Sequence, residues 1–97
     1  MSQNNLTGHT RTIRCIEVSE NGRLVSGSYD HTARVWDLAR MEHVHSLSGH
    51  TEPIYSLAVD VSNRCCTASV DRTARVWDIN TGYEYSMCFI TVILTFL

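Results

Sequence analysis

Thr-Ala-Arg-Val-Trp-Asp stands at residues 32–37 and returns letter for letter at residues 73–78. The interval between the two copies is 41 positions, and a Gly-His pair at residues 8–9 returns at the same interval, at residues 49–50. Aligning the two copies along their length without a gap gives fifteen identical positions. Self-similarity at a fixed period of about 40 residues indicates a structural repeat whose neighbouring units share a core.

A repeat of this length that opens on Gly-His and closes on Trp-Asp resembles the blades of WD40 proteins, each a four-stranded antiparallel sheet. The sequence therefore predicts an all-β fold with two blades of an incomplete β-propeller, at residues 6–46 and 47–86, followed at 87–97 by an apolar tail foreign to the repeat. A propeller closes with about 4–8 blades, and repeat arrays need about three units for stability. We expect the chain to be a fragment of a longer protein or to depend on partners.

Alternating apolar residues and turn signals divide each repeat into four strands. The strongest turn signal is Asn21-Gly22, which predicts a hairpin. In the first strand the apolar alternation slips between Cys15 and Ile16, which predicts a β-bulge there. We expect eight strands, near residues 12–18, 23–28, 32–38, 43–47, 54–60, 64–69, 73–79 and 83–88.

Charge and cysteine content exclude several classes of function. The formal net charge is -2, whereas nucleic-acid binding usually needs a strongly basic face. Four cysteines form no Cys-x-x-Cys pair and have no histidine at zinc-ligand spacing, so we expect no metal, no cofactor and no disulfide framework. The amino terminus lacks a basic and then apolar leader, and the apolar run at 87–97 is shorter than the roughly 20 residues that span a bilayer. We expect an intracellular protein, in the nucleus or the cytoplasm, that binds neither nucleic acid nor membrane.

Each repeat also carries a histidine, a serine, an aspartate and a tryptophan at matching positions. A histidine can donate to a carboxylate through one ring nitrogen and accept from a hydroxyl through the other, and the hydroxyl oxygen can accept an indole N–H. Such a chain satisfies every polar group that it buries, and WD40 blades use it as a structural tetrad. The predicted tetrads are His9, Ser28, Asp30 and Trp36 in the first repeat and His50, Ser69, Asp71 and Trp77 in the second.

Serine, histidine and aspartate are also the residues of a hydrolase triad. The set occurs twice with a tryptophan attached, whereas catalysis needs one copy, and no nucleophile elbow or oxyanion loop is recognisable. We therefore interpret the set as structural and expect no enzyme.

Binding residues of such a repeat protein are expected where strands begin and end. Arg14 lies at the start of the first predicted strand and Tyr29 follows the second, so both can reach the same rim. An arginine beside an aromatic ring suits a phosphate group, because the guanidinium forms two hydrogen bonds and the ring forms a wall. The alternative, that Arg14 is a solvated residue at a strand end, stays open.

A narrower resemblance rests on Gly8-His9-x-x-x-Ile13-Arg14, on Ser28-Tyr29-Asp30 and on Ile54-Tyr55-Ser56. Over residues 6–81 the chain is similar to consecutive blades of the fungal cell division control protein 4 family, the F-box/WD40 substrate receptors of a cullin-RING ubiquitin ligase. The resemblance implies a non-enzymatic module that recognises phosphorylated degrons of other proteins, with Arg14 at the phosphate and Tyr29 and Tyr55 beside it. That family binds the ligase adaptor through an F-box, which these 97 residues lack. The alternative function is a generic WD40 scaffold without phosphate dependence.

Overall fold

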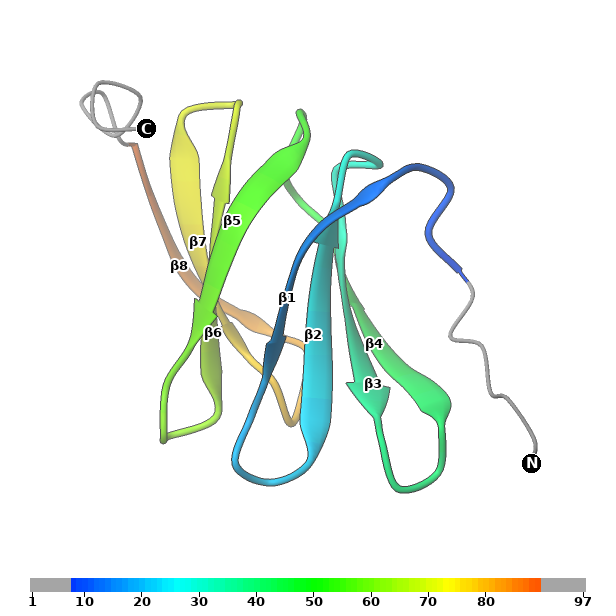
Figure 1. The fold of residues 1–97 in the computed structure, drawn as a ribbon. Coiled ribbons are helices and arrows are strands. Elements are labelled where there is room, and N and C mark those ends of the chain that lie inside the picture. Colours follow the sequence, from blue (N-terminus) through cyan, green and yellow to red (C-terminus); the bar gives the residue numbers. More distant parts are fainter. Residues whose placement is uncertain (1–7, 90–97) are drawn as a thin grey trace.

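Two four-stranded antiparallel sheets make up the structure (Figure 1). It is a computed structural model that describes residues 8–89 of the 97. The first sheet has the strand order β1-β2-β3-β4 and the second β5-β6-β7-β8, and no helix occurs in the described range. The predicted all-β fold of two four-stranded blades is confirmed. The strands are β1 (Ile13–Val18), β2 (Arg23–Ser28), β3 (Ala33–Asp37), β4 (Glu42–Leu47), β5 (Ile54–Val59), β6 (Arg64–Ser69), β7 (Thr73–Asp78) and β8 (Glu84–Phe89).

The first hairpin of each sheet turns on a residue that tolerates a positive φ angle. Gly22 adopts a φ of 84° in the turn between β1 and β2, and Asn63 adopts a φ of 61° in the corresponding turn between β5 and β6. The Asp60 carboxylate supports the second turn, because it accepts the backbone N–H groups of Ser62 and Arg64. Local turn chemistry therefore explains both hairpins.

A β-bulge interrupts the first strand of each sheet, at a position that the sequence pattern missed by one residue. The register shifts between Ile13 and Cys15, so Arg14 is the extra residue, whereas the pattern had predicted the slip between Cys15 and Ile16. β5 has the same irregularity at Tyr55. A bulged residue has no partner on the neighbouring strand and its side chain leaves the regular alternation.

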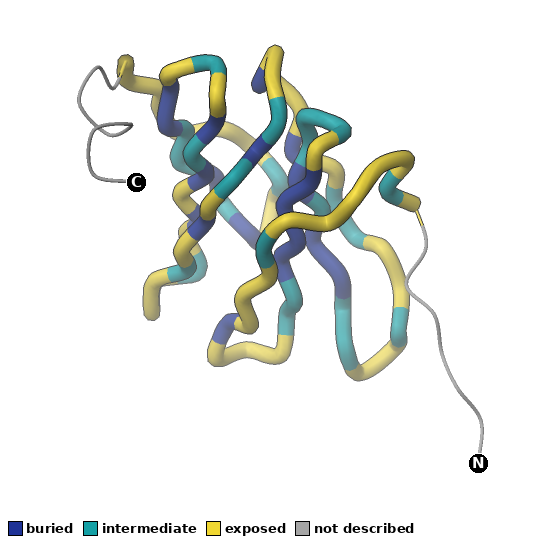
Figure 2. Tube along the Cα trace, turned by 45° about the horizontal axis from the view of Figure 1, so that its top comes forward, coloured by how far each residue is buried: buried dark blue, intermediate teal, exposed yellow. Residues whose placement is uncertain are grey.

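The two sheets pack face to face around one hydrophobic core. β1 and β2 both contact β5, and these strands lie side by side in the middle of the molecule (Figure 1). Buried residues gather along this junction, while the loops at both ends are mostly exposed (Figure 2). The core consists of Val25, Ala33, Val35 and Leu47 from the first sheet and Ile54, Leu57, Cys65, Trp77 and Ile79 from the second.

Gly27 allows the two sheets to approach closely. A Cβ atom at this position would lie 2.8 Å from Cγ2 of Ile54 and 3.1 Å from Cδ2 of Leu57. The 2.8 Å separation is a clash and the 3.1 Å separation is tight, so a side chain at this point of the core would push the two sheets apart.

β8 ends one residue beyond the predicted strand at 83–88 and reaches into the predicted tail. It ends at Phe89 and so includes residues 87–89, which had been assigned to the tail foreign to the repeat. These three residues pair with the first three residues of β7. Strand pairing requires only backbone N–H and C=O groups, so it continues where the side-chain pattern departs from the repeat. Residues 90–97, the rest of the predicted tail, lie outside the described residues.

Shortening a side chain that is buried between the two sheets should destabilise the chain more than shortening the side chain at the same position of the other repeat. Ile54 is fully buried, whereas Ile13, at the same position one repeat earlier, is 46% exposed. We expect Ile54→Ala to lower the free energy of unfolding by about 2–5 kcal/mol because it leaves a cavity, and Ile13→Ala to lower it by about 1 kcal/mol or less. Urea unfolding of the dilute chain, followed by tryptophan fluorescence, measures both values, and equal losses would contradict the packing described.

Candidate functional site

Four polar side chains of the first repeat form one hydrogen-bonded network. Nδ1 of His9 lies 2.8 Å from Oδ2 of Asp30, and Nε2 of His9 lies 2.7 Å from Oγ of Ser26. Nε1 of Trp36 donates to the same Oγ at 2.9 Å. The carboxylate can only accept, so Nδ1–H donates to it, Nε2 accepts the Ser26 proton and the Ser26 oxygen accepts the indole N–H.

The second repeat forms the same network with a threonine in place of the serine. Nδ1 of His50 lies 2.9 Å from Oδ2 of Asp71, and Nε2 lies 2.7 Å from Oγ1 of Thr67. Nε1 of Trp77 donates to that Oγ1 at 2.8 Å. The His50 and Asp71 side chains are 0% and 7% exposed, so the network lies almost out of contact with water. Each network ties the segment before the first strand of its sheet to the middle strands.

The hydroxyl group in each network differs from the predicted one. Ser28 and Ser69 had been predicted, but the residues two positions earlier, Ser26 and Thr67, hold these places. The Ser28 hydroxyl instead bonds to backbone carbonyl groups of the segment before β1, and Ser69 does the same before β5. Both predicted serines are therefore structural residues of the strand ends and lie outside the tetrads.

Strand register explains this correction. Trp36 pairs across the sheet with Leu24, and Ser26 and Ser28 lie two and four residues further along β2, about 7 Å and about 14 Å away at ordinary strand spacing. Both serines point to the same face, so alternation cannot separate them. At the position that the structure selects, the two repeats share only a hydroxyl group, with Ser26 in one and Thr67 in the other. At the predicted position both repeats have a serine, so the sequence favoured that position.

The geometry of the networks does not suit a hydrolase. Ser28 makes no hydrogen bond to His9, and Ser26, which does, is only 1% exposed. Its oxygen also accepts the Trp36 indole N–H, so it is enclosed on the side from which a substrate would have to approach. The arrangement holds strands together.

Hydrogen bonds keep the carboxylates of both networks ionised. Burial raises the pKa of Asp71, but hydrogen bonds from the Thr73 hydroxyl, from His50 and from the backbone N–H groups of Thr51 and Thr73 outweigh it and lower this pKa to about 2. Asp30 has the corresponding partners in the first repeat, and its pKa is held well below its usual range. Both groups therefore stay charged at neutral pH.

The three predicted phosphate-contact residues lie at one end of the two sheets and are called the rim below. Arg14 and Tyr55 are the bulged residues of β1 and β5, at the same repeat position. Tyr29 follows the last residue of β2, where its backbone N–H donates to the carbonyl of Thr12 at 3.0 Å. Because β2 is antiparallel to β1, the end of β2 and the start of β1 coincide.

The rim side chains differ in their surroundings. Arg14 and Tyr29 are exposed, and neither side chain forms a hydrogen bond or ion pair within residues 8–89. Tyr55 is half-buried, and its burial together with the charge of Asp71 raises the pKa of its hydroxyl. This hydroxyl is enclosed and has no hydrogen-bond partner in the described range. The three side chains make no hydrogen bond to one another, so the structure brings them to one end without joining them.

The four cysteines are free, and burial raises the pKa of the Cys65 thiol to about 12. Within residues 8–89 no three histidine, cysteine, aspartate or glutamate side chains are arranged to hold a metal ion. Over the same range, no helix has the length and apolar character needed to cross a membrane.

Comparisons with known proteins agree with this geometry. The family described as WD domain, G-beta repeat matches residues 1–37 and 41–78. The solved structure titled "Structure of U3-55K" is similar with a TM-score of 0.80 at 21% sequence identity, over 86% of this chain and 26% of that chain. The chain thus spans about a quarter of the length of that structure, and the likeness concerns the fold alone. No curated protein matches the sequence. These matches concern WD40 repeats in general, and the narrower resemblance to F-box receptors stays a prediction.

Removing one hydroxyl should show how much a network contributes to stability. Thr67→Val keeps the shape of the side chain but leaves the Trp77 N–H and Nε2 of His50 buried without a partner. We expect this variant to lower the free energy of unfolding by about 1–3 kcal/mol. Thr67→Ser keeps the hydroxyl, as in the first repeat, and should cost about 1 kcal/mol or less. Urea unfolding measures both, and equal losses would show that the hydroxyl is unimportant.

Acid should destabilise the chain through these carboxylates. The pKa of Asp71 is about 2 in the folded chain, against about 3.9 for an unfolded aspartate. The unfolded chain takes up the proton first, so this stabilisation is complete above about pH 4 and is lost as the pH falls toward 2. We expect Asp71→Asn to be less stable at neutral pH and to show a smaller decrease between about pH 5 and pH 2, because an amide does not titrate. Urea unfolding across this range measures the slope, and a slope unchanged by the substitution would refute the assignment.

Proposed function

This chain belongs to the WD40 repeat family, whose repeats are generally non-enzymatic protein-interaction modules, and we propose that its rim recognises phosphorylated segments of other proteins. One observation carries the proposal. The bulges of β1 and β5 set Arg14 and Tyr55 at equivalent places on neighbouring strands. Tyr29, at the end of β2, adds an exposed aromatic ring at the same end of the sheets. An extended segment lying across the rim would meet a cation and two aromatic side chains.

Arg14 provides the charge that a phosphate group requires. It is exposed, and its guanidinium has no ion-pair partner within the described range. A guanidinium binds a phosphate with two parallel hydrogen bonds, which a lysine cannot do. The nearby network carboxylate does not compete for it, because both oxygens of Asp30 already accept hydrogen bonds, from His9, from Thr32 and from the backbone N–H of Thr10.

Tyr55 adds a donor without a partner. Its hydroxyl is enclosed and makes no hydrogen bond with any described residue. Buried polar groups are nearly always paired, and an unpaired one calls for an explanation. If the Tyr55 ring turns outward when a segment binds, a phosphate or backbone oxygen of that segment would give this hydroxyl the acceptor that it lacks.

We extend the proposal to the resembled family of F-box/WD40 receptors. Within a complete receptor, these blades would select phosphorylated proteins for ubiquitylation in the nucleus or the cytoplasm. Contact with the ligase adaptor would require an F-box, which these 97 residues do not contain. Substrate recognition through the rim is therefore the part of that function that can be tested on this chain.

Fluorescence anisotropy tests the proposal on the full chain, with a library of phosphoserine and phosphothreonine peptides, each beside its unphosphorylated form. We expect binding only when phosphate is present, and we expect Arg14→Ala to weaken it by about 10- to 100-fold, the effect of a lost charge-assisted pair of hydrogen bonds. Arg14→Lys should recover part of the affinity, because it restores the charge but not the two parallel hydrogen bonds. Tyr55→Phe should cause a smaller loss.

Arg64→Ala is the matched control for Arg14→Ala. Arg64 begins β6 at the opposite end of the second sheet, where its Nε lies 3.0 Å from Oδ2 of Asp60. Its removal should leave peptide affinity unchanged. Equal binding of phosphorylated and unphosphorylated peptides would favour a scaffold without phosphate dependence. Phosphate-dependent binding that survives Arg14→Ala would place the phosphate away from the rim.

A further inference from the structure

The first sheet has an apolar face turned away from the second sheet, called here the first outer face. Its β1 residues Ile13, Ile16 and Val18 are 46%, 59% and 57% exposed. Adding 41 to each number gives residues by which the second sheet packs onto the first. These are Ile54, Leu57 and Val59. The first outer face therefore has the same kind of surface as the face of the second sheet that is buried against the first sheet.

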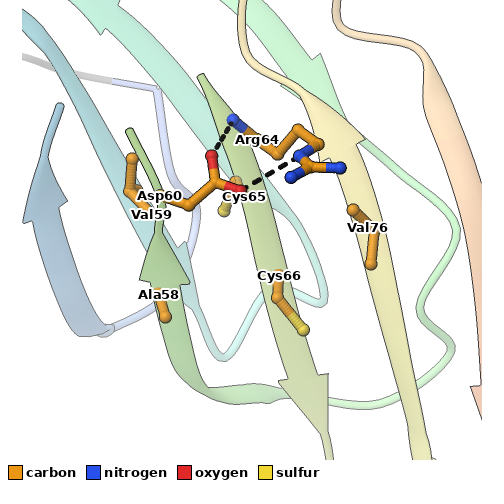
Figure 3. A pocket seen from close by; sticks show the side chains of 7 residues that line it. All are labelled: Ala58, Val59, Asp60, Arg64, Cys65, Cys66 and Val76. Atoms are coloured by element: carbon orange, nitrogen blue, oxygen red, sulfur yellow. Dashed lines mark hydrogen bonds and ion pairs between the residues drawn. The ribbon is translucent and has the colours of Figure 1, made fainter. Parts of the chain in front are cut away.

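The second sheet has a free face of the opposite kind, called here the second outer face. It carries the small apolar residues Ala58, Cys66, Val76 and Cys88, which are exposed or half-buried. Ala58, Cys66 and Val76 line one side of a hollow of about 330 Å³, whose other lining residues are Val59, Asp60, Arg64 and Cys65 (Figure 3). Subtracting 41 from the numbers of Cys66, Val76 and Cys88 gives three residues of the first sheet that lie in the core, where the second sheet packs. They are Val25, Val35 and Leu47.

We propose that a second copy of this chain docks its first outer face onto the second outer face, so that copies join head to tail. The interface inside one chain provides the geometry, because the contact between chains is the same 41-residue step taken once more. Head-to-tail contacts form rings when the rotation closes. Propellers close with about 4–8 blades, so a ring of two-bladed chains would hold two, three or four copies. This assembly is independent of phosphopeptide binding.

At one pair of facing positions, a large side chain meets a small one in both interfaces, but the large side chain comes from opposite partners. Inside the chain, a Cβ on Gly82 would lie 2.9 Å from the imidazole of His45, whose Nε2 lies 2.8 Å from the carbonyl oxygen of Asn80. Between copies, the equivalent positions hold Ser86 in place of the histidine and Met41 in place of the glycine. A large side chain faces a small one in both cases, so the two surfaces remain complementary.

One position makes the contact between copies looser than the contact within the chain. Gly27 corresponds to Ala68 on the second outer face. A Cβ on Gly27 would lie 2.8 Å from Cγ2 of Ile54, so the methyl group of Ala68 crowds Ile13 of the docked copy. Overpacking of this kind weakens an interface. Ala68→Gly should therefore strengthen the association between copies.

Sedimentation velocity of the full chain tests the proposal with one variant on each face. Ile16→Lys puts a charge on the first outer face, and Cys66→Lys puts one in the hollow of the second. The wild-type chain should sediment as a closed species of two to four copies, and each variant alone as the 11.0 kDa chain. An equimolar mixture of the two variants should form a 1:1 complex, because each keeps the face that the other needs.

Val70→Lys is the matched control, since Val70 is an exposed apolar residue in the turn after β6, away from both outer faces. It should assemble as the wild type does. Circular dichroism checks that each variant keeps its sheets, and Ala68→Gly adds a gain of function, lowering the concentration needed for assembly by about fivefold or more. A monomeric wild-type chain would overturn the proposal and leave the outer faces to blades of another protein. Assembly that survives either lysine variant, or a mixture that stays monomeric, would also overturn it.

Discussion

Each four-stranded sheet has apolar side chains on both faces, so both faces have to be covered to keep these side chains out of water. This requirement governs the structure. Within the chain only one pair of faces meets, and the core lies there, with β2 of one sheet close to β5 of the next. Gly27 sets the distance of closest approach, because any side chain at that point would overlap Ile54. The remaining two faces keep the residue types of the covered pair, and this is why we infer that copies of the chain can stack.

The two histidine networks have a different task from the core. Each acts within one sheet and fastens the segment before its first strand to the middle strands through the Trp36 or Trp77 side chain. A histidine that donates to a carboxylate through one ring nitrogen and accepts from a hydroxyl through the other leaves no buried N–H or O–H group of the network without an acceptor, so a polar chain can lie beside an apolar core at little cost. The same networks fix the end of the sheets at which the rim lies, because the tetrad residue Asp30 directly follows Tyr29.

The repeat keeps its framework and varies its rim. The bulge occurs in both first strands, yet the bulged residue is Arg14 in one blade and Tyr55 in the other. The residue before the tetrad aspartate is Tyr29 in the first blade and Val70 in the second. Backbone geometry is therefore shared, while the chemistry at the shared places differs from blade to blade. A rim built in this way can present several kinds of side chain to one extended ligand.

The period of the sequence by itself determined the all-β class, both blades and eight strands whose ends it placed within one or two residues, because alternation and turn chemistry are local. It could not determine the bulge at Arg14 or the hydroxyl in each tetrad, since these depend on the register between paired strands. Alternation gives Ser26 and Ser28 the same face, and only pairing with β3 selects Ser26. Burial was also decided by tertiary structure: Ile13 and Ile54 occupy the same position of the repeat, but Ile54 is fully buried and Ile13 is 46% exposed. The difference lies outside their own repeats, because a sheet covers one of these residues and none covers the other.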